Sequence, residues 1–259
     1  MVSNPQLAIF KPVVGNWPQN STMKKYLKKI LFSKGYKINK INNTPLLNDN
    51  PFLAAKEKIK SEEPIFFDIG INHGQTLKKI KKEFPKSIIH GFEPSKYCFK
   101  QLENDFKSDK IILNNLAVGE KEDVLKFNEY SWDALNSLLE RAFTKAKIIE
   151  KYDVNVTTID NYCKKNGINK IDFLKTDTEG FELKVLKGAK ELMSNNKIQF
   201  IHVEMFFELN FIGQSSAGDI FNFLEENNFS LIRFYDFSNT KNGIASKSDA
   251  LFINSNYER

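Results

Sequence analysis

The sequence lacks several features that would fix a class of protein at once. Its 259 residues include only two cysteines, Cys98 and Cys163, which are too few for a disulfide framework and have no metal-ligand spacing. There is no run of eighteen apolar residues, and the N-terminus lacks the apolar core of a signal peptide, so export or membrane crossing is not predicted. We therefore expect a reduced, cytoplasmic protein.

Two common nucleotide-binding signatures are also missing. The chain has neither the Gly-x-Gly-x-x-Gly fingerprint of dinucleotide sites nor the Gly-x-x-x-x-Gly-Lys-Ser/Thr of a P-loop. Instead, an apolar run from Ile65 breaks at Asp68 and Gly70, and a helical pattern follows Gly74, which predicts a strand, a glycine loop and a helix. A carboxylate beside the first glycine repels a pyrophosphate but balances a cation. The pattern favours S-adenosylmethionine, and a purely structural turn is the alternative.

Composition and charge divide the chain unevenly. Apolar residues make up 41% and charged residues 27%, the proportions of a globular protein with room for one α/β domain and an extension. Of the net charge of +6, the first 60 residues carry +9 from eleven lysines and two acids, and the rest carries −3. We therefore expect a basic N-terminal segment over residues 1–60 and the main domain over residues 61–259.

The N-terminal segment contains one amphipathic helix. After an irregular arm of about twenty residues, an apolar stripe runs from Met23 to Leu31 at helical spacing, opposite four lysines, and Gly35 ends it. The stripe favours packing on the main domain. The lysine face also fits a weak contact with an anionic membrane surface. The segment Asn42 to Pro51 has the composition of a linker.

From residue 65 onward, strands and helices alternate, which predicts a parallel sheet covered on both faces. The expected strands are Ser87–Phe92, Lys110–Leu113, Ile171–Thr176 and Ile198–Val203, with a closing pair at Ser230–Tyr235 and Ala250–Ile253. Helices are expected after Ser95, from Ile159, from Phe181 and over Asp219–Leu224. Short strands at Val124–Phe127 and Val154–Thr158 flank an insertion around Trp132 to Leu139.

Polar residues follow the first three strands. Glu93 comes 23 residues after Gly70, near the ~20-residue offset at which an acid reaches a ribose in nucleotide-binding folds. Asn115 to Ala117 follow the third strand, where a loop covers an adenine. Open α/β sheets bind ligands at these carboxyl ends, so a nucleotide-like cofactor is predicted.

The fourth strand contains a lysine where a parallel sheet should be buried. Lys175 shares a face with Asp177, and a buried charge needs a partner. We expect that partner to be Asp177 on the same strand or Glu204 on the next. An active-site role and a purely structural ion pair are both open at this point.

Taken in order, these motifs resemble the FkbM-type family of S-adenosylmethionine-dependent methyltransferases. The resemblance covers about residues 64 to 207, and the block from Lys175 to Glu182 is its most specific part. The matching stretches are Phe67–Gly74, Gly91–Pro94, Asn115–Gly119, Thr157–Asp160, Lys175–Glu182, Val185–Ala189 and Val203–Glu204.

The resemblance implies a class I methyltransferase fold, a Rossmann-like doubly wound sheet whose last strand is antiparallel, and O-methylation of a hydroxyl, often on a sugar, glycan or glycolipid. It also assigns residues. Those expected to bind the cofactor are Asp68, Gly70, Asn72, Gly74, Glu93, Asn115, Ala117 and Asp177. Independently of the resemblance, Lys175, Asp177, Glu179 and Glu204 are expected to take part in catalysis because of their chemistry and their places near the strand ends. In the loop, Asn72 is kept, while His73 faces either the substrate or the turn.

Several points stay open. The base is sought among Asp177, Glu179, His202 and Glu204, with the carboxylates preferred because His202 lies deeper in its strand and is more often a satisfied core histidine. Asp177 and Glu179 are a minimal alternative site for Mg²⁺, and no metal is predicted. Acceptor choice is expected in two loops, around Trp132, Asn136 and Ser137 and over Phe206 to Ser216. A nucleic-acid methyltransferase and a non-catalytic binding protein are the alternatives.

Overall fold

The computed structural model describes residues 21–34, 46 and 48–257, and its contacts divide the chain between Asn43 and Thr44 into two units. The described part of the first unit is helix α1 (Ser21–Ser33), which confirms the predicted amphipathic helix. The predicted arm and the stop at Gly35 lie outside the described residues. Among the described helices, none is long and apolar enough to span a bilayer.

A seven-stranded sheet organises the second unit. Its order is β3-β2-β1-β7-β8-β10-β9, and only β10 runs antiparallel to its neighbours, so the predicted mostly parallel sheet with an antiparallel last strand is confirmed. The strands are β1 (Ile65–Ile69), β2 (Ile88–Phe92), β3 (Ile111–Asn114), β7 (Ile171–Thr176), β8 (Ile198–Phe206), β9 (Phe229–Asn239) and β10 (Ala245–Asn254).

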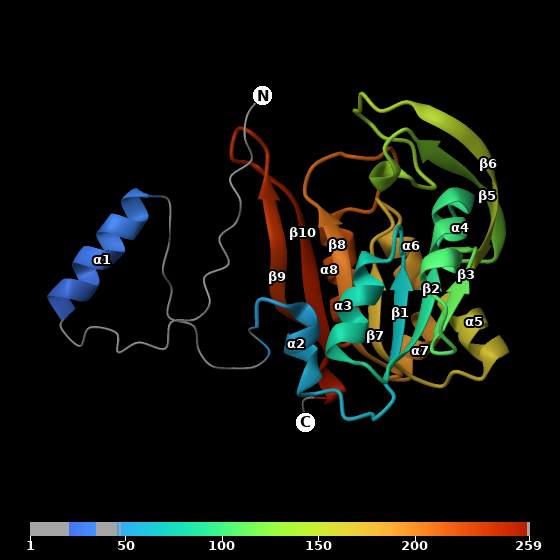
Figure 1. The fold of residues 1–259 in the computed structure, drawn as a ribbon, viewed down its shortest axis with the longest axis horizontal. Helices are drawn as coiled ribbons and strands as arrows, with labels where there is room; N and C mark the ends of the chain where they lie inside the picture. The colour runs from blue at the N-terminus through green and yellow to red at the C-terminus, as the bar shows by residue number, and fades with distance from the viewer. Residues whose placement is uncertain (1–20, 35–45, 47, 258–259) are drawn as a thin grey trace. The chain divides into compact units, whose positions relative to one another are not determined.

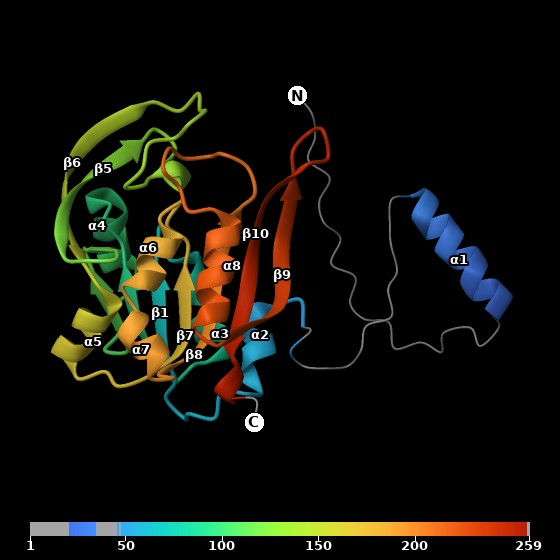
Figure 2. The same ribbon diagram turned by 180° about the vertical axis from the view of Figure 1, so that it is seen from behind.

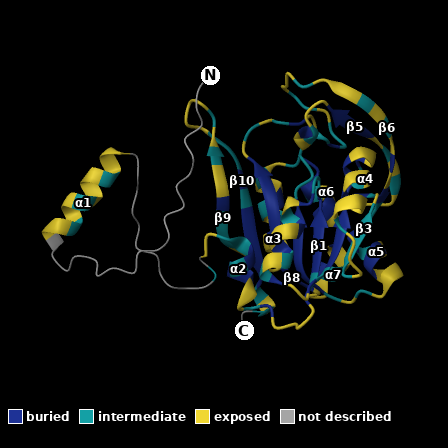
Figure 3. Ribbon diagram, in the orientation of Figure 1, coloured by how far each residue is buried: buried dark blue, intermediate teal, exposed yellow. Residues whose placement is uncertain are grey.

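Helices cover both faces of this sheet. Figure 1 shows the face with α2 (Pro51–Lys56), α3 (Gln75–Glu83) and α4 (Lys96–Asp105). Figure 2 shows the other face, with α5 (Ile159–Asn166), α6 (Glu182–Lys187), α7 (Lys190–Ser194) and α8 (Ala217–Glu226). A 3-10 turn, η3 (Ser255–Tyr257), follows β10. Strand side chains alternate between two cores, as Phe66 and Phe67 do. Figure 3 shows the central strands as buried throughout.

Helix α2 belongs to the main unit, although its residues fall within the segment predicted as a basic extension. Asn50 caps it by accepting a hydrogen bond from Phe52 N, and Pro51 begins it, both common at helix starts. The Phe52 ring then packs on Phe173 with centroids 5.2 Å apart. Helix α2 therefore packs with the main unit, which begins at Thr44 by its contacts, and the division of the chain at residue 60 stays a prediction.

A second, three-stranded sheet flanks the insertion. It contains β4 (Ala117–Val118), β6 (Ile148–Thr157) and β5 (Asp123–Tyr130), so the strands predicted here are confirmed but are longer than expected. The insertion contains a 3-10 turn, η2 (Asp133–Leu135). Bridges join Asn128 to Ser137 and Arg141 to Phe211. The insertion therefore contacts the loop after β8, which brings together the two segments expected to select the acceptor.

Candidate active site

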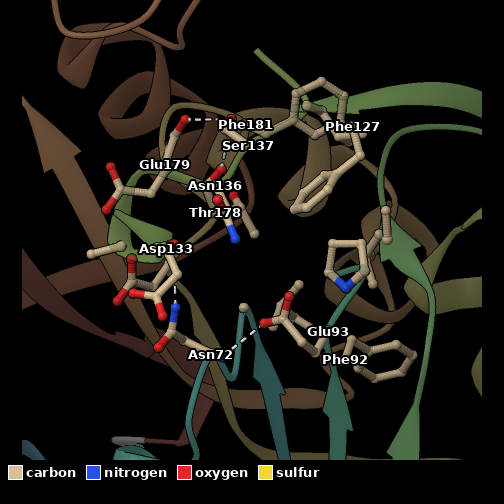
Figure 4. A pocket seen from close by; sticks show the side chains of 18 of the residues that line it. Asn72, Phe92, Glu93, Phe127, Asp133, Asn136, Ser137, Thr178, Glu179 and Phe181 are labelled. Atoms are coloured by element: carbon tan, nitrogen blue, oxygen red, sulfur yellow. Dashed lines mark hydrogen bonds between the residues drawn. The ribbon is translucent and has the colours of Figure 1, made fainter. Parts of the chain in front are cut away.

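A pocket of about 300 Å³ lies at the carboxyl ends of the central strands, within the size range of small-molecule sites. Figure 4 shows Phe127 and Phe181 on one side of it and Asp133 and Glu179 on the other. Its lining comes from the loops after β1, β2, β3 and β7 and from the insertion. The lining residues are Ile69, Gly70, Asn72, Gln75, Thr76, Phe92, Glu93, Pro94, Leu116, Ala117, Val118, Phe127, Asp133, Ala134, Asn136, Ser137, Leu138, Asp177, Thr178, Glu179 and Phe181.

The glycine loop is shaped by close backbone contacts. Gly70 has φ +81°, and a Cβ there would lie 1.9 Å from the carbonyl oxygen of Asp177, so only glycine lets the loops after β1 and β7 meet. Gly74, at φ +76°, precedes α3 without a side-chain cap. The first turn of α3 therefore keeps free N–H groups, and its residues Gln75 and Thr76 line the pocket.

Glu93 is fixed at the pocket wall by the loop after β1. Its Oε2 accepts a hydrogen bond from Asn72 N at 2.7 Å, and its Oε1 accepts one from Ser95 N at 2.8 Å. Burial raises the pKa of Glu93 to about 7 despite these bonds. Asn72 has φ +52° and donates from Nδ2 to the backbone oxygen of Asp133 at 3.4 Å. The two predicted residues thus lie together, under the insertion.

Three residues expected at the cofactor, Asp68, Gly74 and Asn115, are not among those that line the pocket; Gly74 lies beside the lining residue Gln75 at the start of α3. Asp68 is 0% exposed and lies on the opposite face of β1 from Ile69. Asn115 donates from Nδ2 to the backbone oxygens of Glu93 and Pro94. Asp68 and Asn115 therefore support the site from behind, and direct contact of the three residues with a cofactor stays a prediction. Ala117, also predicted, does line the pocket.

Lys175 is buried between two carboxylates. Its Nζ lies 3.3 Å from Asp177 Oδ2 and 3.4 Å from Asp68 Oδ1, and 7% of the residue is exposed. The partner predicted on the same strand is confirmed, and the second partner is Asp68 rather than Glu204. Burial lowers the pKa of Lys175, but Asp177 and Asp68 outweigh it and raise the pKa. The lysine therefore stays charged.

Three predicted residues form an acidic cluster. Asp177, Glu179 and Glu204 each place a carboxylate oxygen within 4.8 Å of the others, and Lys247 binds Glu204 Oε1 at 2.5 Å. Burial and then Asp177 raise the pKa of Glu179 to about 8 and that of Glu204 well above its usual value. Burial also opposes ionisation of Asp177, but Lys175 and Lys247 outweigh it and lower its pKa. Within the cluster, the surroundings therefore favour the ionised form most strongly at Asp177.

Two acids that the sequence did not single out hold loops of the site in place through hydrogen bonds. Glu129 accepts hydrogen bonds from Ser95 Oγ, Tyr152 Oη and Asn136 Nδ2. Glu182 Oε1 accepts from Thr178 N and Gly180 N and thereby shapes the loop after β7. Glu182 lay within the most specific motif block, so a signal existed for it. For Glu129 there was none, because its partners come from distant segments.

Both histidines considered at the sequence level lie near the site. His73 Nε2 is 2.6 Å from Asp133 Oδ2, and its Nδ1 is 3.0 Å from Gln101 Oε1, so it ties the glycine loop to the insertion. His202 is buried as expected, but neither of its ring nitrogens has a hydrogen-bond partner. The reading of His202 as a satisfied core histidine is therefore wrong.

The charge of the pocket indicates what it can hold. The described residues that line it include four acids, Glu93, Asp133, Asp177 and Glu179, and no lysine or arginine. Such a lining disfavours phosphate and fits the sulfonium and ammonium of S-adenosylmethionine. Together with the strand order β3-β2-β1-β7-β8-β10-β9, it defines a class I S-adenosylmethionine-dependent methyltransferase.

The chain belongs to the FkbM methyltransferase domain family, whose model matches residues 68–231. A solved methyltransferase FkbM from Methylobacillus flagellatus is 17% identical, with a TM-score of 0.48, over 75% of this chain and 44% of that one. The 2-O-methyltransferase NoeI of Sinorhizobium fredii is 23% identical over 56% of this chain and 65% of that protein.

A guanylate kinase of Wigglesworthia glossinidia brevipalpis is also similar, at 33% identity over 53% of this chain and 66% of that protein. This chain has no P-loop motif, and the acidic pocket offers no cation for a phosphate, so kinase chemistry has no support in its residues. The chain spans slightly less than two thirds of the length of each of these two relatives.

Proposed function

We propose that the protein transfers a methyl group from S-adenosylmethionine to a hydroxyl of a sugar, glycan, glycolipid or related metabolite. The observation that carries the proposal is the acidic cluster at one end of the pocket, because a hydroxyl acceptor must lose a proton to a nearby base. The resemblance to sugar O-methyltransferases and the 2-O-methyltransferase named among the relatives support it.

The residues present fit the cofactor. Glu93 would accept the ribose hydroxyls, Leu116 to Val118 would contact the adenine, and the N–H groups at the start of α3 would bind the carboxylate. Asp177, beside the pocket, would balance the cationic end. When bound, S-adenosylmethionine supplies an electrophilic methyl group.

The chain's own residues would prepare the acceptor. Lys175 keeps Asp177 ionised and in place, and Asp177 would orient the hydroxyl as a hydrogen-bond acceptor. Glu179 lines the pocket and has a pKa of about 8, close to the operating pH, which suits a general base. Glu204, held by Lys247, lies behind them and would share the proton.

The three carboxylates are also the group that can hold a divalent cation. However, Glu204 already forms an ion pair with Lys247, and Asp177 forms one with Lys175. We therefore propose a metal-independent reaction, for which chelator should leave the rate unchanged.

Cys98 and Cys163 are free, and burial raises the pKa of each thiol to about 12, so both are unreactive. This is compatible with the reducing cytoplasm, where we propose that the reaction takes place.

The test is transfer of labelled methyl from S-adenosylmethionine to defined acceptors. Neutral methyl glycosides and glycolipids are compared with RNA and DNA. We expect labelled sugar, and a loss of rate of about 100-fold or more in Glu179→Gln. Labelling of RNA or DNA alone would replace the proposal with a nucleic-acid methyltransferase, and no labelling despite cofactor binding would favour a binding protein.

A further inference from the structure

A second hollow adjoins the cofactor pocket. It has a volume of about 380 Å³ and is lined by residues of the loop before α2, of helix α3 and of strands β7 to β10. Figure 1 shows α2 and α3 on the same face of the sheet. Thr76 and Asp177 line both this hollow and the cofactor pocket. The two spaces therefore meet at a proposed active-site carboxylate.

The floor of the hollow is a polar row on the sheet. Lys175 of β7 and His202 of β8 are register partners, and Asp249 of β10 pairs with Glu204, two residues beyond His202 on β8. His202 is 5% exposed, and its Nε2 is 3.9 Å from Asp249 Oδ2, beyond hydrogen-bond distance. Burial, and then Lys175, lower the pKa of His202 to about 3. The imidazole is therefore neutral, with one free donor and one free acceptor.

Unpartnered buried imidazole nitrogens are uncommon in folded proteins, because each loses its hydrogen bonds to water. Here both belong to a residue that lines an open hollow. A ligand with hydroxyl groups would supply both missing bonds, since a hydroxyl donates and accepts. The arrangement thus favours a polyhydroxylated ligand over an apolar one.

The charges of the hollow narrow the ligand further. Its described lining carries the lysines Lys79, Lys82 and Lys175 and five acids, Asp49, Glu83, Asp177, Asp236 and Asp249. The excess of acids disfavours a phosphate or a uronic acid. Pro51 and Phe52 are the apolar residues of that lining, which leaves little surface for a lipid chain.

We propose that this hollow is the acceptor site and binds a neutral sugar, with Asp249 and His202 on the ring hydroxyls and the reacting hydroxyl at Asp177. The inference rests on the proposed function, which leaves the place of the acceptor open. It assigns specificity to β8, β10 and α3 in addition to the two loops expected from the sequence.

The experiment measures binding of methyl glycosides of glucose, galactose, mannose and rhamnose to protein loaded with S-adenosylhomocysteine, by saturation-transfer NMR titration. Methyl glucuronoside is the anionic comparison. We expect at least one neutral glycoside to bind. Its affinity should fall at least tenfold in Asp249→Asn and in His202→Gln, while S-adenosylmethionine affinity changes less than twofold.

Matched variants on α3 guard against misfolding of the buried substitutions. Lys78 and Lys79 are both exposed neighbours, but only Lys79 is among the lining residues. Lys79→Ala should weaken glycoside binding at least threefold, and Lys78→Ala should leave it unchanged. Asp153→Asn, on β6 away from both spaces, is the control for Asp249→Asn.

The outcomes separate the two proposals. If sugars are methylated but the lining variants bind them as the native protein does, this acceptor site is wrong and the proposed function stands. If no neutral glycoside binds while the cofactor does, the sugar site is overturned together with the sugar acceptor. Equal binding of methyl glucuronoside would refute the charge argument.

Discussion

The ion pair between Lys175 and Asp68 offers the sharpest test of how the site is built. Asp68 is 0% exposed, and neither of its carboxylate oxygens has a hydrogen-bond partner, so Lys175 at 3.4 Å is its counter-charge. Replacing Lys175 with methionine keeps the volume and removes that charge. Removing one partner of a buried pair costs about 3–5 kcal/mol of unfolding free energy. For a domain of this size, that is a fall in Tm of roughly 6–20 °C.

The assay is denaturant unfolding of Lys175→Met beside two comparisons. Lys126→Met removes an exposed pair with Asp153, whose side chains are 68% and 57% exposed, and should cost less than about 1 kcal/mol. The double variant Lys175→Met, Asp68→Asn also removes the unpaired charge of Asp68. It should regain at least half of the unfolding free energy that Lys175→Met loses.

The stability of Lys175→Met should depend on pH in a defined direction. Burial raises the pKa of Asp68, and without Lys175 it rises further, so the folded protein binds a proton that the unfolded chain releases. Its stability should therefore fall as pH rises from about 4 towards neutrality. A cost no larger than that of Lys126→Met, or no rescue by Asp68→Asn, would refute the reasoning.

Three further predictions follow from the site and from α1. Gly70→Ala should weaken S-adenosylmethionine binding at least tenfold. Gly243 has a similar φ of +80° but nothing within 4 Å of an added Cβ, so Gly243→Ala should lower only the unfolding free energy, by about 1 kcal/mol of backbone strain. Equal losses of affinity in the two variants would contradict the contact with Asp177. The transfer rate should rise about tenfold per pH unit up to about pH 8, because Glu179 acts as a base only when deprotonated, and Glu179→Gln should remove that rise; a flat profile from pH 6 to 8 in the native enzyme would exclude this base. Changing Lys24, Lys25, Lys28 and Lys29 to glutamine should abolish sedimentation with anionic vesicles, because each lysine contributes about 1 kcal/mol to the binding free energy. Equal sedimentation of the variant and the native protein would show that these lysines do not bind the membrane.

The sequence was most informative where local pattern and burial coincide. The segment Ile171–Thr176 was predicted as a strand and forms β7 to the residue, although Asp172 and Lys175 interrupt its apolar character. The Ser95 cap of α4 was equally readable, since its side chain accepts from Cys98 N. The position of Glu93 and Asp177 at the same edge of the sheet follows from topology, because the carboxyl ends of parallel strands meet there.

What the sequence could not supply were the partners that tertiary structure brings together. Lys247 reaches Glu204 from β10, 43 residues along the chain, and Asp68 rather than Glu204 became the second partner of Lys175. Helix α2 was missed because Asn50 and Pro51 are typical of linkers and of helix starts alike. The unpartnered state of His202 depends on β10 and on the hollow above it, which no local pattern encodes.

The central claim is that the acidic pocket binds S-adenosylmethionine, and calorimetric titration tests it most directly. We predict saturable 1:1 binding of S-adenosylmethionine and S-adenosylhomocysteine, and no binding of NAD or GMP. Glu93→Gln should weaken that binding about tenfold or more, as expected for loss of a hydrogen bond to a charged group. Glu103→Gln, exposed on α4, should not change it. Binding of GMP in place of S-adenosylmethionine, or an unchanged affinity in Glu93→Gln, would contradict the account.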